Sequence, residues 1–188
     1  MLQNYNMYIK HPWHGVDPEW DQHHLLGLIE ISKGLKSKYE IDKLSGLLKL
    51  DRVLHTSFEY PINYGFIPQT LGEDGDPLDI LVLSQINIVP LCLVRCYVIG
   101  VMHMIDRGKG DDKIIAVAAS DPSVNEIKTL DQLPKYLEAE LRHFFQQYTV
   151  LENKKVTVNE FNGIDDARRI INEAVERYQT SGFDGSEL

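Results

Sequence analysis

The first third of the chain alternates between apolar and polar positions in short runs. Residues 25–31 (Leu-Leu-Gly-Leu-Ile-Glu-Ile), 38–41 and 47–50 have the composition and the alternation of β-strands. Residues 42–46, Asp-Lys-Leu-Ser-Gly, separate the last two runs and are typical of a turn. This part of the chain is therefore predicted to form an antiparallel meander.

Further strand signals follow in the middle of the chain. Residues 60–68 contain two prolines and a glycine, which predict an extended, rigid segment. Residues 80–83 and 114–118 are short apolar runs of the kind found in buried strands. Residues 86–101 are apolar over a greater length, and Pro90 marks a turn, so this run is predicted to hold one or two strands.

The last third changes to the helical period. Pro134 fits the first turn of a helix. The apolar face of this helix is predicted to consist of Leu137, Leu141, Phe144, Phe145 and Tyr148. A second helix is predicted over residues 165–179, with Ala167, Ile170, Ile171, Ala174, Val175 and Tyr178 on its apolar face. The segment between them, residues 155–158, is predicted to be extended.

These elements predict an α+β fold that is mainly β, a barrel or curled sheet with two helices added late in the chain. The 188 residues suit one domain, and no linker or repeat divides them. We therefore expect a single domain over residues 1–188, with residues 1–24 as an N-terminal extension and residues 180–188 as a frayed tail.

Four acidic side chains lie within residues 72–79, Gly-Glu-Asp-Gly-Asp-Pro-Leu-Asp, directly before an apolar run. Gly75 and Pro77 exclude a helix here, so the acids sit on a turn at the mouth of a strand. Carboxylates held this close repel one another and favour a bound cation, above all Mg²⁺, which prefers oxygen ligands. A turn that contains these residues only for their backbone preferences is the alternative.

Two better-known acidic motifs fit this turn poorly. An EF-hand loop that began at Asp74 would have Leu78 at its fifth position, Asp79 where glycine is required and Gln85 where glutamate is required. An aspartyl-phosphate nucleophile normally follows a strand, whereas these acids precede one.

A second acidic turn lies at residues 106–113, Asp-Arg-Gly-Lys-Gly-Asp-Asp-Lys, and also leads into an apolar run. It adds basic side chains that suit phosphate oxygens, although a solvated charged loop is the alternative. Carboxylates suit divalent metals, and lysine, arginine and tyrosine side chains suit phosphate. The combination favours metal-assisted phosphoryl transfer to water, with a spare carboxylate as the proton acceptor.

The overall charge narrows the range of partners. The chain has 19 basic and 28 acidic residues, a net charge of −9, which disfavours nucleic acid and anionic membranes as partners. No apolar run approaches the roughly 20 residues that span a bilayer, and no signal-peptide pattern is visible.

Cys92 and Cys96 would lie about 13 Å apart along a strand, too far for a disulfide. We expect reduced core cysteines and a cytoplasmic protein.

Histidines in the opening segment raise a second metal hypothesis. His11, His14, His23 and His24 lack the spacing of a zinc site, and no cysteines accompany them. We therefore expect surface or interface histidines.

The acidic turn and several other segments resemble one known family. Residues 74–79, Asp-Gly-Asp-Pro-Leu-Asp, resemble the signature of the soluble family I inorganic pyrophosphatases. Other segments resemble this family in the same order: residues 38–43 (Lys-Tyr-Glu-Ile-Asp-Lys), 51–52 (Asp-Arg), 60–65 (Tyr-Pro-Ile-Asn-Tyr-Gly), 106–113 and 143–148. They cover about residues 25–160. The start at residues 11–14, His-Pro-Trp-His, resembles the plant-like branch.

The resemblance implies a five-stranded, OB-like β-barrel with helices outside it and an acidic cavity at its centre. It implies Mg²⁺-dependent hydrolysis of pyrophosphate to two orthophosphates, with several Mg²⁺ ions in each active site. It also implies a homo-oligomer, since bacterial members are often hexamers and fungal members are often dimers.

The resemblance further implies a role for each matching residue. Asp76 would be the general base. The metal ligands would be Asp74, Asp79 and Asp111 for the two ions that share the nucleophilic water, and Asp106 and Glu30 for the ions that arrive with substrate. The phosphate ligands would be Lys38, Arg52, Tyr64, Lys113 and Tyr148, supported by Glu40 and Tyr60.

One position departs from the family pattern. The family usually has lysine directly after the tyrosine that matches Tyr148, whereas this chain has Thr149. The missing ammonium predicts weaker pyrophosphate binding, by about 1 to 3 kcal/mol if nothing replaces it, with metal binding intact. Lys154 and Lys155 lie close in sequence, but the sequence does not show that either reaches the site.

Three other functions stay open on the sequence alone. They are a non-enzymatic ligand-binding barrel, a metal-dependent phosphatase that acts on nucleotides or phosphate esters, and a structural domain whose acids only solvate loops. The last predicts no effect of divalent metals on stability.

Overall fold

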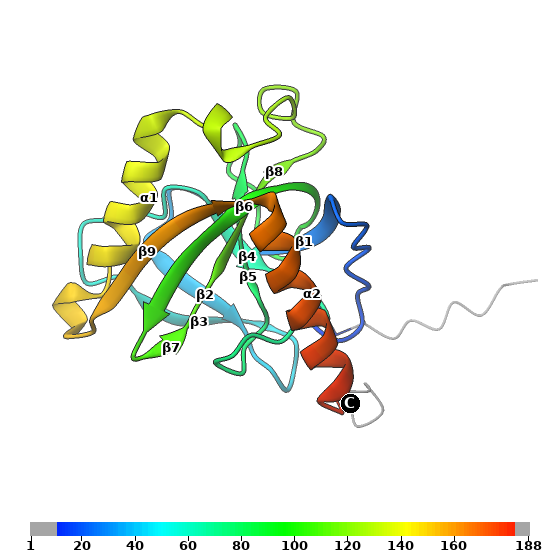
Figure 1. Cartoon of the computed structure of the whole chain (residues 1–188). Helices are drawn as coiled ribbons and strands as arrows, with labels where there is room; N and C mark the ends of the chain where they lie inside the picture. Colours follow the sequence, from blue (N-terminus) through cyan, green and yellow to red (C-terminus); the bar gives the residue numbers. More distant parts are fainter. Residues whose placement is uncertain (1–10, 183–188) are drawn as a thin grey trace, which may run out of the picture.

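Five strands form a closed hydrogen-bonded ring in the computed structural model, which describes residues 11–182 (Figure 1). In ring order they are β1 (His24–Ile31), β4 (Asn63–Phe66), β5 (Asp79–Leu83), β8 (Lys113–Ala118) and β6 (Leu93–Asp106). The pairing of β6 with β1 closes the ring. Every neighbouring pair is antiparallel except β5 and β8, which are parallel. The predicted five-stranded barrel is confirmed.

Four further strands lie beside this ring. β9 (Val156–Gly163) pairs with the second half of β6, and β7 (Lys109–Gly110) forms a short hairpin with its end. β2 (Ser37–Ile41) and β3 (Leu48–Val53) pair with each other in a separate two-stranded sheet.

The predicted meander over residues 25–50 is therefore wrong, although each of its strands is present. Both edges of β1 are taken by β4 and β6, so β1 cannot pair with β2. Residues 32–36 lead the chain away from the barrel, and the N–H of Gly34, at φ +83°, donates to the carbonyl of Tyr60 at 2.8 Å. The hairpin of β2 and β3 therefore lies at one end of the barrel, where it lines a cavity together with the strand ends.

The apolar run over residues 86–101 forms one strand, and this strand begins and ends later than expected. β6 starts at Leu93 because the preceding loop is held by a buried side chain, that of Asn63. Its Oδ1 accepts from the N–H groups of Ile88 at 2.9 Å and Lys33 at 3.1 Å, and its Nδ2 donates to the carbonyl of Ile86 at 3.1 Å. The hydrogen bonds of the buried Asn63 amide thus hold residues 86–92 as a loop, although their apolar composition predicts a strand.

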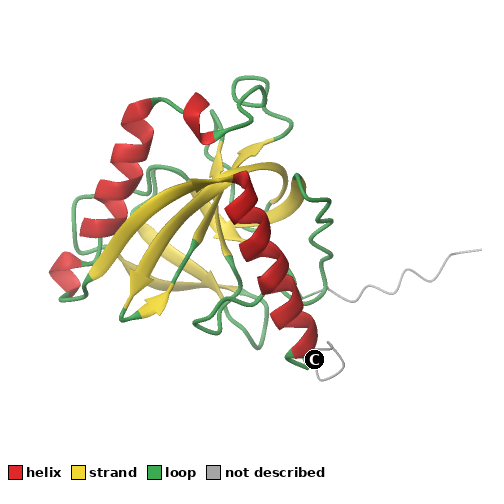
Figure 2. Ribbon diagram, in the orientation of Figure 1, coloured by secondary structure: helices red, strands yellow, loops and turns green. Residues whose placement is uncertain are grey.

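Two helices cover opposite sides of the barrel (Figures 1 and 2). α1 (Lys135–Gln147) buries Leu137, Leu141, Phe144 and Phe145, and α2 (Ile164–Thr180) buries Ala167, Ile170, Ile171, Ala174 and Tyr178. The predicted apolar faces are confirmed, except that Val175 and Tyr148 are only partly buried. Short 3₁₀ turns precede and follow α1, at Leu130–Gln132 and Val150–Glu152.

The described part of the N-terminal segment packs on the barrel. Trp13 is buried, and its indole N–H donates to the carbonyl of Thr70 at 2.9 Å. His14 Nδ1 lies 2.8 Å from the hydroxyl of Tyr178 in α2. Residues 1–10 of the predicted extension and residues 183–188 of the predicted tail lie outside the described residues.

Gly65 in β4 lies directly against β1, and we expect a Gly65→Ala variant to be less stable by on the order of 3 kcal/mol. A Cβ at this position would lie 1.9 Å from the carbonyl oxygen of Leu28, which is fixed in the barrel ladder. The free energy of unfolding in urea measures the effect. The matched control is Gly163→Ala, where a Cβ has nothing within 4 Å, and a loss below about 1 kcal/mol is expected. Equal losses in the two variants would contradict the steric explanation.

Candidate active site

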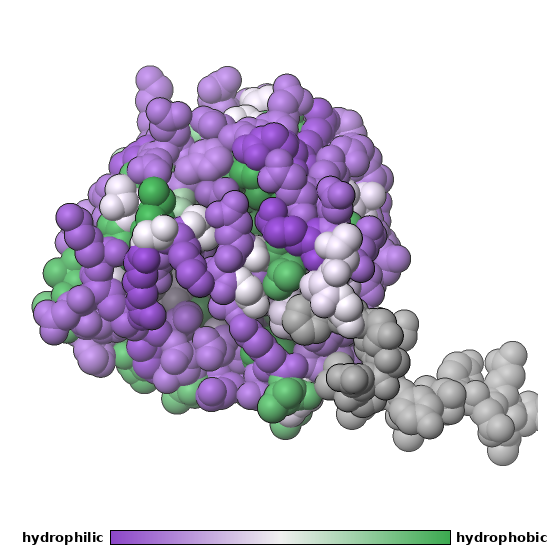
Figure 3. Space-filling view, turned by 60° about the horizontal axis from the view of Figure 1, so that its bottom comes forward, coloured by the Kyte–Doolittle hydropathy of each residue, from purple (hydrophilic) through white to green (hydrophobic). Residues whose placement is uncertain are grey.

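A cavity of about 550 Å³ opens between the hairpin of β2 and β3, the acidic turn before β5 and the ends of β6 and β8. All thirteen site residues predicted from the sequence line it: Glu30, Lys38, Glu40, Arg52, Tyr60, Tyr64, Asp74, Asp76, Asp79, Asp106, Asp111, Lys113 and Tyr148. Figure 3 brings the bottom of Figure 1 forward, where β7 lies, and shows a mainly hydrophilic face. The structure thus gathers these side chains around one cavity, while their roles stay predictions.

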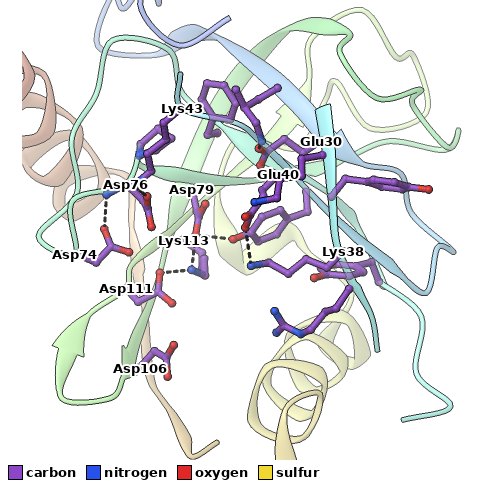
Figure 4. A pocket seen from close by; sticks show the side chains of 18 of the residues that line it. Glu30, Lys38, Glu40, Lys43, Asp74, Asp76, Asp79, Asp106, Asp111 and Lys113 are labelled. Carbon is purple, nitrogen blue, oxygen red and sulfur yellow. Dashed lines mark hydrogen bonds and ion pairs between the residues drawn. The ribbon is translucent and has the colours of Figure 1, made fainter. Parts of the chain in front are cut away.

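The acidic turn is held by its own backbone. The N–H of Gly72 donates to the carbonyl of Asp76 at 2.7 Å, and the N–H of Asp76 donates to Oδ1 of Asp74 at 3.0 Å. Gly75, at φ +92°, takes the left-handed conformation that closes the turn. These bonds hold the carboxylates of Asp74 and Asp76 at the mouth of the cavity (Figure 4).

The parallel pair of strands brings opposite charges together. Asp79 and Lys113 are the first residues of β5 and β8, and they are register partners. The Lys113 ammonium, only 2% exposed, bonds to the carboxylates of both Asp79 and Asp111. Asp79 Oδ2 also accepts the hydroxyl hydrogen of Tyr64 at 2.6 Å (Figure 4). An ammonium therefore sits between two carboxylates at the bottom of the cavity.

Burial shifts the titration of this group of side chains. It raises the pKa of Asp79 to about 6, although the Lys113 ammonium opposes the shift. Burial also opposes the charge on Lys113, but the carboxylates of Asp79 and Asp111 outweigh it and raise the pKa of the ammonium. Burial raises the pKa of Tyr64 as well, so its hydroxyl remains a hydrogen-bond donor at neutral pH.

Cations lie on the opposite wall, on the hairpin of β2 and β3. Lys38 and Arg52 are register partners across the two strands, which places them side by side. Lys38 Nζ lies 3.4 Å from Glu40 Oε2 and 3.3 Å from Asp51 Oδ2. Arg52 also pairs with Asp51. Figure 4 shows Lys38 across the cavity from Asp74, Asp106 and Asp111.

The aromatic residues of the site differ in position. Tyr60 is buried in the core, with its ring centroid 5.7 Å from that of Tyr64 and 4.9 Å from that of Phe144. Tyr148 ends α1, and its ring stacks on Phe144 at 5.2 Å. Tyr60 thus packs between Tyr64 of the cavity wall and Phe144 of α1.

Glu30 lies in β1 and is almost completely buried. Its Oε1 accepts from the backbone N–H of Ile41 in β2 at 2.6 Å. Burial raises the pKa of its carboxyl to about 8 from an ordinary 4.5, against the opposing effect of the Ile41 hydrogen bond.

In the metal-free protein we expect Glu30 to make stability fall as the pH rises from about 4.5 to about 8. The folded state keeps this proton over that range and the unfolded state releases it, so the stabilisation is complete below the lower value and lost above the higher one. The loss is up to roughly 5 kcal/mol, since each unit of pKa corresponds to about 1.4 kcal/mol. Urea unfolding in EDTA at several pH values measures it.

The Glu30→Gln variant keeps an acceptor for Ile41 but cannot titrate, so its stability profile should be flatter over this pH range. Glu160→Gln, at an exposed position, is the matched control and should follow the unmodified chain. Parallel profiles for Glu30→Gln and the unmodified chain would contradict the assignment.

Asp106 offers the clearest test of whether these residues fit a divalent cation. Its Oδ1 is buried and has no hydrogen-bond partner within residues 11–182. A buried carboxylate oxygen without a donor is costly, and a hard cation satisfies it. No three His, Cys, Asp or Glu side chains of the described range are close enough to enclose one ion, because Asp79 and Asp111 gather around the Lys113 ammonium. The donor set, all oxygens, fits Mg²⁺.

Three lysines that the sequence-based assignment leaves out also line the cavity, Lys43, Lys49 and Lys154. Lys43, in the turn after β2, pairs with the carboxylate of Asp76, and its Nζ donates to the carbonyl of Gly75 at 3.3 Å (Figure 4). Lys154 reaches the cavity from the turn after α1. The local sequence signals a turn near Lys43 but does not indicate that the turn crosses the cavity mouth.

The histidines of the N-terminal segment differ in exposure. His23 is exposed, as expected of a surface histidine, whereas His11 and His14 are partly buried, and His11 Nε2 has no hydrogen-bond partner among the described residues. His23 Nδ1 lies 2.9 Å from a guanidinium nitrogen of Arg168, and His24 Nδ1 lies 3.2 Å from Asp21. None of the helices in the described range is both long and apolar enough to cross a membrane.

Comparisons with known proteins agree with this architecture. The sequence model described as inorganic pyrophosphatase matches residues 27–179. The chain is 46% identical over 170 residues to soluble inorganic pyrophosphatase 2 of Chlamydomonas reinhardtii, covering 90% of this chain and 88% of that protein. It is 47% identical over 169 residues to a soluble inorganic pyrophosphatase of rice (Oryza sativa), covering 89% of this chain and 79% of that protein.

Solved structures show the same fold. An inorganic pyrophosphatase of Helicobacter pylori superposes with a TM-score of 0.84 at 41% identity, covering 87% of this chain and 98% of that chain. One from Thermus thermophilus gives a TM-score of 0.85 at 36% identity, covering 90% and 99%. The predicted fold class, family and diphosphatase activity are confirmed, and the chain belongs to the soluble family I inorganic pyrophosphatases.

Proposed function

We propose that this cavity hydrolyses inorganic pyrophosphate to two orthophosphates with the help of bound divalent cations, Mg²⁺ above all. One observation carries the proposal. A single cavity gathers the carboxylates of Asp74, Asp106 and Asp111 across from Lys38, with further cationic side chains around them, as a substrate made of two phosphates and several metal ions requires.

The carboxylates would hold the metal ions. We assign this role to Asp74, Asp79 and Asp111, with Asp106 and Glu30 for the ions that enter with substrate. The partnerless oxygen of Asp106 supports its part of the assignment. Bound metal ions would lower the pKa of a coordinated water and neutralise charge on the phosphates.

The cationic and hydroxyl groups would bind and orient the phosphates. We assign Lys38, Arg52, Lys113, Tyr64 and Tyr148 to the phosphate oxygens. Lys113 supports this assignment because its ammonium already makes two charge-assisted bonds to oxygen at the bottom of the cavity. The raised pKa values of Tyr64 and Tyr148, both caused by burial, keep their hydroxyls protonated as donors.

Asp76 would accept the proton of the attacking water at a carboxylate oxygen. Its side chain is exposed at the cavity mouth, where it pairs with the Lys43 ammonium. Glu40 would position Lys38 through their ion pair, and Tyr60 would support the ring of Tyr64.

Orthophosphate release from pyrophosphate tests the function directly. We expect release with Mg²⁺ and almost none with EDTA. A nucleoside triphosphate and a phosphate monoester under the same conditions test the alternative of a general phosphatase. No release from pyrophosphate with Mg²⁺ would overturn the proposal, and equal release with EDTA would overturn its metal dependence.

We also propose a cytoplasmic homo-oligomer. Cys92 and Cys96 are both free thiols, as a reducing compartment favours. Exposed apolar side chains near the start of β6, among them Ile86, Val89 and Leu91, support self-association. Sedimentation velocity would measure the mass, and a monomer at micromolar concentration would contradict the oligomer.

A further inference from the structure

One wall of the cavity carries a continuous row of alternating charges, and the row extends beyond the predicted phosphate ligands. It runs from Lys38 through Asp51 to Arg52, and from there through Glu152 to Lys154. Arg52 Nε donates to Glu152 at 2.9 Å, and Lys154 Nζ lies 3.1 Å from Glu152 Oε2. Lys38, Arg52 and Lys154 line the cavity, whereas Asp51 and Glu152, which hold these cations in the row, do not.

The turn after α1 brings Lys154 back to the cavity. The short helix Val150–Glu152 is followed by Asn153, which reverses the chain in the left-handed conformation at φ +57°. The N–H of Lys154 then donates to the carbonyl of Thr149 at 3.3 Å, and the Thr149 hydroxyl donates to the carbonyl of Lys154 at 3.4 Å. Both residues line the cavity.

Glu152 holds two cations at once in a sheltered position. Its side chain is only 6% exposed. Burial opposes its charge, but the hydrogen bonds from Lys154 and Arg52 outweigh burial and lower the pKa of the carboxyl. An ammonium has three N–H donors, and the bond to Glu152 uses one of them. Lys154 can therefore donate to a second oxygen while it stays anchored.

We propose that Lys154 is a substrate-binding residue that donates to a phosphate oxygen of pyrophosphate, with Glu152 as the positioning residue for Lys154 and Arg52. The inference rests on the proposed function, because a phosphate group is the ligand that three cations on one wall of a cavity suit. It also modifies the expectation of weak substrate binding, since an ammonium from position 154 reaches the wall on which Thr149 supplies only a hydroxyl.

Steady-state kinetics of Lys154→Ala and Lys155→Ala test the proposal. Lys155 is the next residue, is exposed and does not line the cavity, so it controls for net charge and for the local backbone. We expect Lys154→Ala to raise the KM for pyrophosphate and the inhibition constant for inorganic phosphate about tenfold to a hundredfold, the worth of one charge-assisted hydrogen bond. Lys155→Ala should change neither constant by more than about twofold.

Further variants separate binding from structural support. Lys154→Arg keeps the charge and should recover most of the affinity, whereas Lys154→Gln should not. Glu152→Gln should raise the same two constants, because a neutral amide oxygen holds the two cations more weakly than a carboxylate. Thermal melting of each variant in EDTA checks that the fold is intact.

The outcomes separate the two proposals. An unmodified protein that releases no phosphate from pyrophosphate with Mg²⁺ overturns the proposed function. An active unmodified protein with identical constants for Lys154→Ala and Lys155→Ala overturns the assignment of Lys154 alone. A Lys154→Ala variant with a lower kcat and unchanged constants for pyrophosphate and phosphate also overturns it, since binding would then be intact.

Discussion

The Asp76→Asn variant is expected to hydrolyse pyrophosphate about a hundredfold to ten-thousandfold more slowly than the unmodified enzyme, in kcat, while it folds normally. An amide cannot take a proton from the attacking water, and the loss of a general base typically costs this much. The fold should survive because Asp76 lies on an exposed turn, and its backbone bonds to Gly72 and Asp74 do not involve its own carboxylate. Orthophosphate release at saturating pyrophosphate and Mg²⁺ measures the effect.

Glu73→Gln is the matched control for this variant. Glu73 is an exposed acid in the same turn and does not line the cavity, so its variant has the same net charge but should keep its activity. A fully active Asp76→Asn variant would exclude Asp76 as the base. Similar losses in both variants would attribute the effect to the charge of the turn.

The Lys113→Met variant is expected to lose about 3 to 5 kcal/mol of folding stability at pH 8 in EDTA. Removal of this ammonium leaves the carboxylates of Asp79 and Asp111 close together without a counter-charge, and a broken buried pair typically costs this much. Burial already raises the pKa of Asp79 to about 6, and loss of the ammonium raises it further. Protonation should therefore relieve part of the loss at pH 5. Urea unfolding at the two pH values measures it.

Addition of Mg²⁺ at pH 8 should restore part of this stability, because a cation can replace the missing positive charge between the two carboxylates. Lys109→Met, at an exposed position in the neighbouring hairpin, is the matched control and should cost below about 0.5 kcal/mol. A loss in Lys113→Met that is the same at pH 5 and pH 8 would contradict the explanation by unpaired carboxylates.

Local pattern predicted the elements of this fold well and their pairing poorly. Both long helices follow from apolar periodicity, most strands of the barrel from alternating or continuous apolar runs, and the extended segment of β4 from its prolines and glycine, all of which are local signals. The closure of β1 against β6 depends on residues about 70 positions apart in sequence, such as Leu25 and Cys96, and no local signal specifies it. The late start of β6 has a similar cause, since a single buried amide, Asn63, fixes the preceding loop.

The residues of the candidate site were predicted from two kinds of signal, local composition and resemblance to a family. The turn at residues 72–79 reveals its acids by composition alone, but the assignment of separate roles to Asp74, Asp76 and Asp79 came from resemblance to a family. The sequence left open whether Lys154 or Lys155 reaches the site. The place of Lys154 on the wall depends on the left-handed conformation of Asn153 and on its ion pair with Glu152, which Arg52 also contacts. These contacts depend on the tertiary structure, and no periodic pattern in the sequence indicates them.

The one parallel pair of the barrel determines where the chain tolerates changes in length. β5 and β8 run in the same direction, so the turns that precede them open at the same end of the barrel. Deletion of one residue within β8 would shift the register between β5 and β8 by one residue. Lys113 would then no longer lie opposite Asp79, and its side chain would point to the other face of the sheet. Insertion at Gly108, where a Cβ would have nothing within 4 Å, leaves this pairing intact. Homologous chains should therefore vary in length in the hairpin before β8 and stay constant in length from Asp111 to Ala118.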